Sequence, residues 1–247
     1  MEVHAHSHTE RKKWTHYLWE FLMLFLAVFC GFLAENQREH MVEHQREKKY
    51  INSLITDLKG DTALIRSVIS FCITKFNGMD TLAQLLNKDI LSNDQEKELY
   101  YLNDEYAASI YIMVFNERTI KQLLNSGNLR LVRKQETSDS IINYYGSLEV
   151  IKGQENVYDE MSRRLIFSAE DIFDNSASMK KMNPDSSFYH DIRQEKMKLI
   201  TKDKNVLRKY SQMIITARGM LASYVSMLFQ MKRTGKDLLV FLEHEYK

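Results

Sequence analysis

Apolar residues gather first in one uninterrupted run near the N-terminus. Phe21 to Ala34 (FLMLFLAVFCGFLA) contains only apolar or small residues, and Tyr17 extends the run toward the N-terminus. The eighteen residues 17–34 form a helix about 27 Å long, close to the hydrocarbon thickness of a bilayer. Glu20 is the only charged residue in this stretch, and an aromatic belt lies at its start: Trp14, Tyr17 and Trp19. The pattern predicts a transmembrane helix over residues 14–35.

The flanks of this run favour a signal anchor that is not cleaved. The run ends in Phe32-Leu33-Ala34, so a bulky Phe stands where cleavage requires a small residue. Basic residues crowd positions 11–13, and they are closer to the span than those that follow it. We therefore expect residues 1–13 to be a cytoplasmic His-rich and basic tail. Residues 36–247 are expected outside the inner membrane, which in a Gram-negative cell is the periplasm.

Beyond the anchor, the apolar residues follow the period of an α-helix. Six of them recur at every seventh position: Ile51, Leu58, Ile65, Cys72, Met79 and Leu86. We call these six residues the heptad stripe, because their spacing is typical of a coiled coil. Asp61-Thr62 interrupts the companion positions once, and Gly60 and Gly78 each cost a helix about 1 kcal/mol. The stripe predicts one long helix to about residue 86, continuous with the anchor, and a candidate oligomer seam.

A second helix is predicted after a break near residues 87–94. Ser92, with Gln95 three positions later, resembles a capping box. The helix is expected to run to about Ser126, because Gly127 suits the left-handed conformation that ends many helices. One Gly is too few for a phosphate-binding loop, so Asn125–Arg130 is interpreted as a helix end.

Two more helices complete the predicted architecture. The third is expected from about Thr137 to Met182, with a cap at Asn183-Pro184 after it. The last covers roughly Asp203 to Glu245, where apolar residues recur at three- and four-residue steps. The sequence thus predicts an all-α protein, with one transmembrane helix followed by an elongated helical bundle of about four long helices.

Composition supports long helices and narrows the classes of function. Pro occurs 1 time and Gly 8 times in 247 residues, which argues against hairpins and Gly-rich nucleotide loops. The 34 Lys and Arg nearly balance the 33 Asp and Glu, so no net field attracts nucleic acid. Two Cys cannot form a disulfide framework. No cofactor and no small-molecule substrate is indicated.

Parts of the chain resemble a family known only by its sequences. The run WEFLMLFLAVFCGFLAENQREHMVEHQREKKYINSL, followed by DLKGDT and later NSGNLRLV, is similar to an uncharacterised family of bacterial single-pass membrane proteins. The likeness is strongest over residues 12–62 and 116–145. It implies the anchor and the helical domain, and it implies no activity, because the family is classed as a domain of unknown function.

One motif could carry metal chemistry. His40, Glu43 and His44 fit the H-x-x-E-H pattern, in which two His bind zinc and the Glu activates water. A zinc hydrolase would also need a third ligand, and no second signature is present. The same residues belong to the charged segment 35–49, in which acidic and basic residues alternate as on a solvated or oligomer-facing helix.

Glu20 is a second candidate, because acidic residues within a span often relay protons or pair with a partner helix. It lies at the cytoplasmic edge of the span, where an interfacial role beside Lys12 and Lys13 is the simpler interpretation. The tail carries His4, His6 and His8, which could bind a metal adventitiously. Cys72 lies in the heptad stripe, where a Cys behaves as a small hydrophobic residue.

Three functions are compatible with these features. The favoured one is a non-catalytic, membrane-anchored helical module that contacts its own copies or other envelope proteins. The alternatives are a signal-input or channel-accessory subunit that uses Glu20, and a zinc hydrolase at His40, Glu43 and His44.

Overall fold

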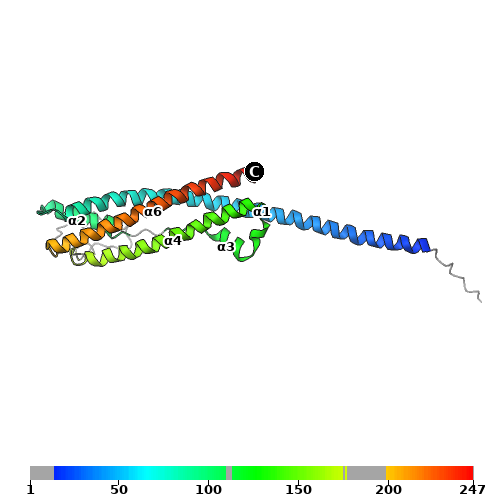
Figure 1. Cartoon of the computed structure of the whole chain (residues 1–247), viewed down its shortest axis with the longest axis horizontal. Helices are drawn as coiled ribbons and strands as arrows, with labels where there is room; N and C mark the ends of the chain where they lie inside the picture. The colour runs from blue at the N-terminus through cyan, green and yellow to red at the C-terminus, as the bar shows by residue number, and fades with distance from the viewer. Residues whose placement is uncertain (1–13, 110–112, 175, 177–198, 247) are drawn as a thin grey trace, which may run out of the picture. The chain divides into compact units, whose positions relative to one another are not determined.

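The computed structural model describes residues 14–109, 113–174, 176 and 199–246, and these residues are mostly helical (Figure 1). In this part of the chain the only β-type pairing is an isolated bridge between Phe173 and Leu199, so the predicted all-α class is confirmed. The chain forms two compact units, Met1–Tyr50 and Ile51–Lys247. The elements are α1 (Trp14–Leu86), α2 (Asn93–Leu102), the π-helix η1 (Asn103–Ala107), α3 (Arg118–Asn125), the 3-10 helix η2 (Asn128–Leu131), α4 (Gln135–Ala169) and α6 (Lys204–Glu245).

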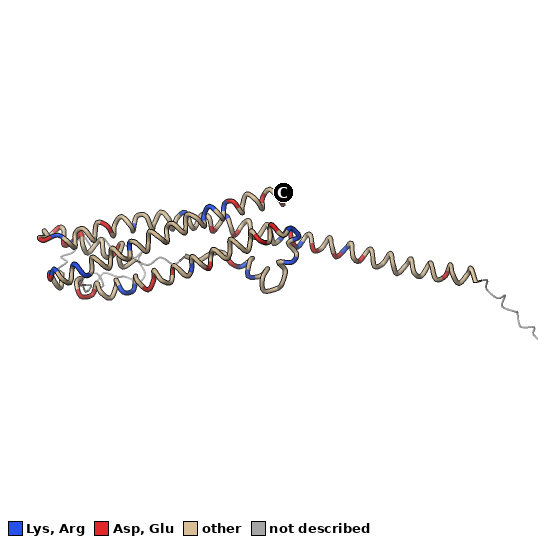
Figure 2. The backbone as a smooth tube through the Cα atoms, in the orientation of Figure 1, with Lys and Arg blue, Asp and Glu red and all other residues tan. Residues whose placement is uncertain are grey.

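Helix α1 confirms the prediction of one long helix from the anchor to Leu86. Its N-terminal part contains the one helix segment in the described residues that is long and apolar enough to cross a membrane. The mean hydropathy of that window is 2.0, and none of it is buried. No charged residue lies between Glu20 and Glu35, whereas acidic and basic residues mix along the bundle helices (Figure 2).

Three long helices form the bundle of the second unit: residues 51–86 of α1, together with α4 and α6 (Figure 1). Helix α6 runs antiparallel to α1, because Ser211 Oγ donates to the Ala83 carbonyl oxygen while Lys59 pairs with Glu243 at 2.7 Å. The three helices approach closely at Gly235 of α6. A Cβ there would lie 2.9 Å from the Tyr144 ring of α4 and 3.2 Å from Thr62 of α1.

The heptad stripe forms the core of this bundle. All six of its residues are buried within a single chain, with exposed fractions of 3% or less: Ile51, Leu58, Ile65, Cys72, Met79 and Leu86. Residues covered inside one copy are not available on its surface to a second copy. The prediction of an oligomer seam at these positions is therefore corrected, since their helical partners belong to the same chain.

The second predicted helix is divided in two. Its start is confirmed, because Ser92 and Gln95 form the capping box, but α2 gives way to η1, and residues 113–117 are not helical before α3 begins. The physical reason is the distance along α1 between two contacts that this part of the chain makes. Ser109 contacts Lys75 and Asn116 contacts Asp61, two positions of α1 that lie fourteen residues, or roughly 21 Å, apart. One continuous helix from Ser109 to Asn116 would span only about 10 Å, so it could not make both contacts.

The ends of the later helices are partly as predicted. Gly127 has the expected left-handed φ of 66°, and Asp203 caps α6 by accepting from the Asn205 N–H at 2.8 Å. Helix α4 ends at Ala169, thirteen residues before the predicted Met182, because Ile172 and Phe173 turn into the core. There the Phe173 ring packs edge-on against two tyrosine rings, those of Tyr100 and Tyr210. The predicted cap at Asn183-Pro184 lies outside the described residues.

Candidate functional site

The residues predicted to lie at a membrane interface are on an exposed part of α1. Trp14, Tyr17 and Trp19 are 77%, 56% and 64% exposed. Glu20 Oε1 lies 3.1 Å from His16 Nε2, and both side chains are about half exposed. The structure thus gives Glu20 a partner one helical turn away on α1 itself. The roles predicted for these residues at a membrane remain predictions.

The H-x-x-E-H residues lie on one helix, as their spacing requires. His40 and His44 are one turn apart on α1, and His44 Nδ1 lies 3.2 Å from Glu47 Oε2. Among the described residues, no group of three His, Cys, Asp or Glu side chains is placed to hold a metal ion. The structure therefore does not bring a third ligand of this kind to His40 and His44 from the described residues.

A buried lysine lies in the middle of the bundle. Lys75 of α1 is 2% exposed, and its Nζ donates to the Ser109 carbonyl oxygen and, at 3.3 Å, to Ser109 Oγ. The same ammonium lies 5.5 Å from the centre of the Tyr158 ring, a cation–π arrangement. Burial lowers the pKa of Lys75 from its usual value to about 8.

Acidic and thiol groups surround Lys75. Glu155 and Asp159 of α4 line the same small cavity as Cys72, and its volume is about 20 Å³, room for about one water molecule. Glu155 Oε1 accepts a hydrogen bond from the Met113 N–H at 3.1 Å, and burial raises the pKa of its carboxyl group. Burial also raises the pKa of the Cys72 thiol to about 11, so Cys72 is protonated at neutral pH. The hydrogen bonds of Lys75 and Glu155 hold Ser109 and Met113 against α1 and α4. The cavity of about 20 Å³ leaves no room for a substrate.

The ionisation of Lys75 predicts a pH effect on stability. Below pH 8 the folded protein buries the charged ammonium of Lys75, which the unfolded chain exposes to water. Between pH 8 and 10.5 Lys75 is mostly neutral in the folded protein and protonated in the unfolded chain, so unfolding takes up a proton. The unfolding free energy contributed by Lys75 therefore rises with pH in this window. Relative to a Lys75→Met variant, the wild type is expected to gain about 1–2 kcal/mol between pH 7.5 and 9.5. Urea unfolding of both full-length proteins in detergent measures the difference.

The comparison with Lys75→Met removes the contributions of titrating groups that do not interact with Lys75. Cys72 does interact with Lys75, and its raised pKa acts in the opposite direction, so a Cys72→Ser background is used for both proteins. A Lys75→Arg variant is the control, because a guanidinium stays charged over the whole window. A constant difference between wild type and Lys75→Met across these pH values would show that Lys75 is not buried as a titrating ammonium.

A second buried polar cluster lies nearer the start of the bundle. Asp61 of α1 is fully buried, and its Oδ1 accepts two hydrogen bonds of 2.9 Å from Asn116, one from the backbone N–H and one from the side chain. Gly60 makes room for this contact, because a Cβ there would lie 2.9 Å from Asn116 Nδ2. Burial raises the pKa of Asp61, and the neighbouring acids Asp57 and Glu117 raise it further.

The cluster includes polar atoms that find no hydrogen-bond partner among the described residues. These are buried oxygens of α1 and α4: Asp57 Oδ2, Asp61 Oδ2, Tyr144 Oη and Tyr145 Oη. The rings of Tyr144 and Tyr145 pack edge-to-face at 5.2 Å, and burial together with the nearby Asp61 raises the pKa of both phenols. Burial raises the pKa of Asp61 although the two hydrogen bonds from Asn116 act to lower it, so ionisation of this carboxyl group is less favourable than in water.

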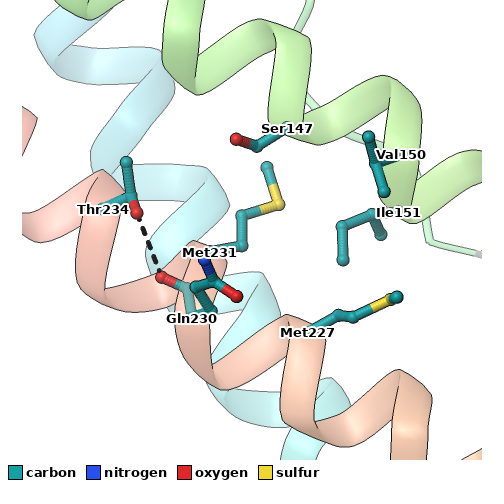
Figure 3. Close-up of a pocket in the computed structure, with 7 residues that line it drawn as sticks. All are labelled: Ser147, Val150, Ile151, Met227, Gln230, Met231 and Thr234. Atoms are coloured by element: carbon teal, nitrogen blue, oxygen red, sulfur yellow. Dashed lines mark hydrogen bonds between the residues drawn. The ribbon is translucent and has the colours of Figure 1, made fainter.

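Two open grooves lie along α4. A groove of about 250 Å³ between α4 and α6 has a mixed lining: Ser147, Val150, Ile151, Met227, Gln230, Met231 and Thr234. Figure 3 shows Val150 and Ile151 projecting from α4 toward Met227 and Met231 of α6. A second groove, of about 370 Å³, lies between α3 and α4 and is mainly apolar, with Ile120, Leu124 and Ile142 in its lining. The two grooves lie along different parts of the α4 surface.

The sequence pattern alone does not mark Lys75, Asp61 or the tyrosines of α4 as functional candidates. A signal for Asp61 was present, because Asp61-Thr62 interrupts the apolar stripe without a nearby basic partner on the same helix face. Comparison with protein-family models, with curated proteins and with solved structures gave no match. The proposed function therefore depends on the residues of this chain alone.

Proposed function

We propose that this protein is a non-catalytic, membrane-anchored helical module that presents its bundle to another protein in the cell envelope. One observation carries the proposal: a single helix contains both an exposed apolar segment suited to a bilayer and the stripe that forms the bundle core. A segment with mean hydropathy 2.0 and no buried residue is costly in water and stable in hydrocarbon.

The bundle surface supports the choice of a protein partner. The core stripe is covered within the chain, so any contact with another protein involves the outer faces of the helices. Helix α4 offers apolar side chains there, including Val150 at 61% and Val157 at 51% exposure. The buried groups around Lys75 and Asp61 serve to hold the bundle together in this proposal.

The proposed location is the inner membrane, with the N-terminus in the cytoplasm and the bundle outside it. Basic residues at positions 11–13 support this orientation. C-terminal fusions test it: a phosphatase active only outside the cytoplasm is expected to be active, and a fluorescent protein that matures only inside is expected to stay dark. The opposite pair of results would overturn the orientation.

Site-specific photocrosslinking in intact cells tests the interaction itself. We expect a photoreactive residue at Val157 to give protein adducts, and one at Arg233, an exposed residue of α6, to give fewer. Extraction at high pH, which releases peripheral proteins, is expected to leave the full chain in the membrane. Release of the chain, or the absence of adducts at exposed positions of α1, α4 and α6, would contradict the proposal.

A further inference from the structure

Two carboxyl groups and two phenol groups lie together inside the bundle. We call these residues the acid–tyrosine cluster: Asp57 and Asp61 of α1, and Tyr144 and Tyr145 of α4. Their exposed fractions are 9%, 0%, 0% and 7%, so each residue is more than nine-tenths buried. The two acids are four positions apart and share one face of α1. Burial and the nearby Asp61 raise the pKa of both phenols, so these groups lie within electrostatic reach of its carboxyl group.

One oxygen of each residue in the cluster is buried and makes no hydrogen bond within the described part of the chain: Asp57 Oδ2, Asp61 Oδ2, Tyr144 Oη and Tyr145 Oη. A phenol can donate and a carboxylate can accept, yet none of these atoms bonds to another. Buried polar atoms of folded proteins nearly always have a partner. Four neighbouring oxygens without one indicate that a bound species lies between them.

The charges around the cluster indicate that this species is a cation. No base of the described residues forms an ion pair with Asp57 or Asp61. Glu117, a third acid that influences Asp61, already pairs with Lys121 at 2.6 Å and with Lys152. Two adjacent buried carboxylates are unfavourable without a compensating positive charge. Protonation of one acid is the competing explanation, and it predicts no response to a cation.

We propose that the acid–tyrosine cluster binds a calcium ion that links α1 to α4, a role beyond the proposed function and independent of it. Two carboxylates balance the charge of a divalent cation. All the donors are hard oxygens, which Ca²⁺ prefers, whereas structural zinc sites rely on nitrogen and sulfur ligands that the cluster lacks. Ca²⁺ also accepts irregular geometry and water ligands, which suits a set with only two carboxylates, whereas Mg²⁺ requires nearly ideal octahedral geometry.

The surroundings of the cluster orient it and give the ion a path. Asn116 holds Asp61 by two hydrogen bonds to Oδ1, which leaves Oδ2 for the ion. Glu117 and Tyr145 line the groove of about 370 Å³ between α3 and α4, so this groove adjoins the cluster. Asp57 retains 9% exposure, and the site is therefore buried without being sealed.

Thermal unfolding of the full-length protein in detergent tests the site. Circular dichroism follows unfolding in EGTA and in excess CaCl₂, at equal pH and ionic strength. A ligand that binds only the folded state raises the melting temperature, and saturating Ca²⁺ is expected to raise that of the wild type by about 5 °C or more. Asp57→Asn and Asp61→Asn are each expected to abolish this shift. In EGTA, Asp57→Asn is expected to melt no lower than the wild type, because it removes one of two like charges.

Two exposed acids of the same helix provide the matched control. Glu35 and Glu39 are also four positions apart on α1, and both are exposed. The variant Glu35→Gln/Glu39→Gln is expected to keep the full shift with Ca²⁺. Helical circular dichroism of every variant before heating shows that each one is folded.

Terbium luminescence locates the ion, because Tb³⁺ replaces Ca²⁺ at oxygen sites and emits when a nearby phenol absorbs light. The wild type is expected to give emission excited through tyrosine, and Ca²⁺ is expected to displace it. Tyr145→Phe is expected to lose most of this emission. Tyr17→Phe, at an exposed position of α1, is expected to keep it.

Three results would overturn the proposal: no shift of the melting temperature with CaCl₂, a shift that persists in both Asp57→Asn and Asp61→Asn, or terbium emission that Ca²⁺ does not displace. An equal shift with MgCl₂ would overturn the assignment to calcium. Each of these results would leave the proposed function standing, since a bundle without the ion can still contact another protein.

Discussion

Replacing Ile51, Leu58 and Ile65 together by Asn is expected to unfold the bundle of the full-length protein. All three side chains are fully buried in a single chain. Each substitution removes an apolar side chain from the core and buries an amide without a designed partner, at a cost of about 3 kcal/mol or more. Three such changes cost about 10 kcal/mol, comparable with the whole stability of a typical domain. Far-UV circular dichroism and protease resistance of the detergent-solubilised variant measure the loss.

Three exposed positions of the same helix provide the control. Thr56, Ala63 and Ser70 also recur every seventh residue, but they lie on the outer face of α1. Changing them together to Asn is expected to keep the fold and its protease resistance, because only helix propensity changes. If the Ile51, Leu58 and Ile65 variant kept its helices and lost only association between copies, the stripe would be an intermolecular surface and the observed core would be contradicted.

The two outcomes, loss of the fold or loss of association between copies, differ in where the helical partner of the heptad stripe lies. The stripe alone could not predict this. A seven-residue apolar repeat requires a helical partner, and the sequence therefore indicated the helix, its length and its buried face correctly. It could not say whether the partner belongs to the same chain, because core and coiled-coil seams obey the same packing rules. The stripe is covered from within the chain, and the burial of Ile51 and Leu86 at its two ends shows that this holds over its whole length.

The part of the chain around Ser109 and Asn116, which contacts α1, shows a different limit of what the sequence could predict. Residues 109–115 read SIYIMVF, and β-branched and aromatic residues of this kind favour extended chain over helix. That local signal competed with two signals of helix ends, the capping box at Ser92 and the left-handed conformation at Gly127. Both features are present in the structure as predicted. The need to return along α1 is set by contacts between distant residues, such as Asp61 with Asn116, which periodicity does not record. The same holds for Lys75, whose carbonyl partner at Ser109 is 34 positions away.

Gly78→Ala is expected to lower the unfolding free energy by about 2 kcal/mol, although alanine is the better helix former. Gly78 is buried in α1, and a Cβ there would lie 2.1 Å from Cδ2 and 2.3 Å from Cγ of Tyr106. The near atoms belong to the base of the ring, so the tyrosine cannot relieve the overlap by moving its hydroxyl end alone. Tyr106 belongs to η1, and its displacement would also disturb the ring contact with Tyr101 at 6.1 Å. Urea unfolding of the full chain in detergent measures the change.

A comparison with Gly219 separates the packing cost from helix propensity. Gly219 is exposed on α6, with nothing within 4 Å of its Cβ position, so Gly219→Ala is expected to stabilise the protein by up to about 1 kcal/mol. A double-mutant cycle then locates the clash: in a Tyr106→Ala background, Gly78→Ala is expected to become stabilising, as at Gly219. If Gly78→Ala stabilised the wild type as well, the close approach of η1 to α1 would be wrong. The glycine would then be an ordinary weak point of the helix, and the place where the chain turns back would have to be fixed by the contacts of Lys75 and Asp61 alone.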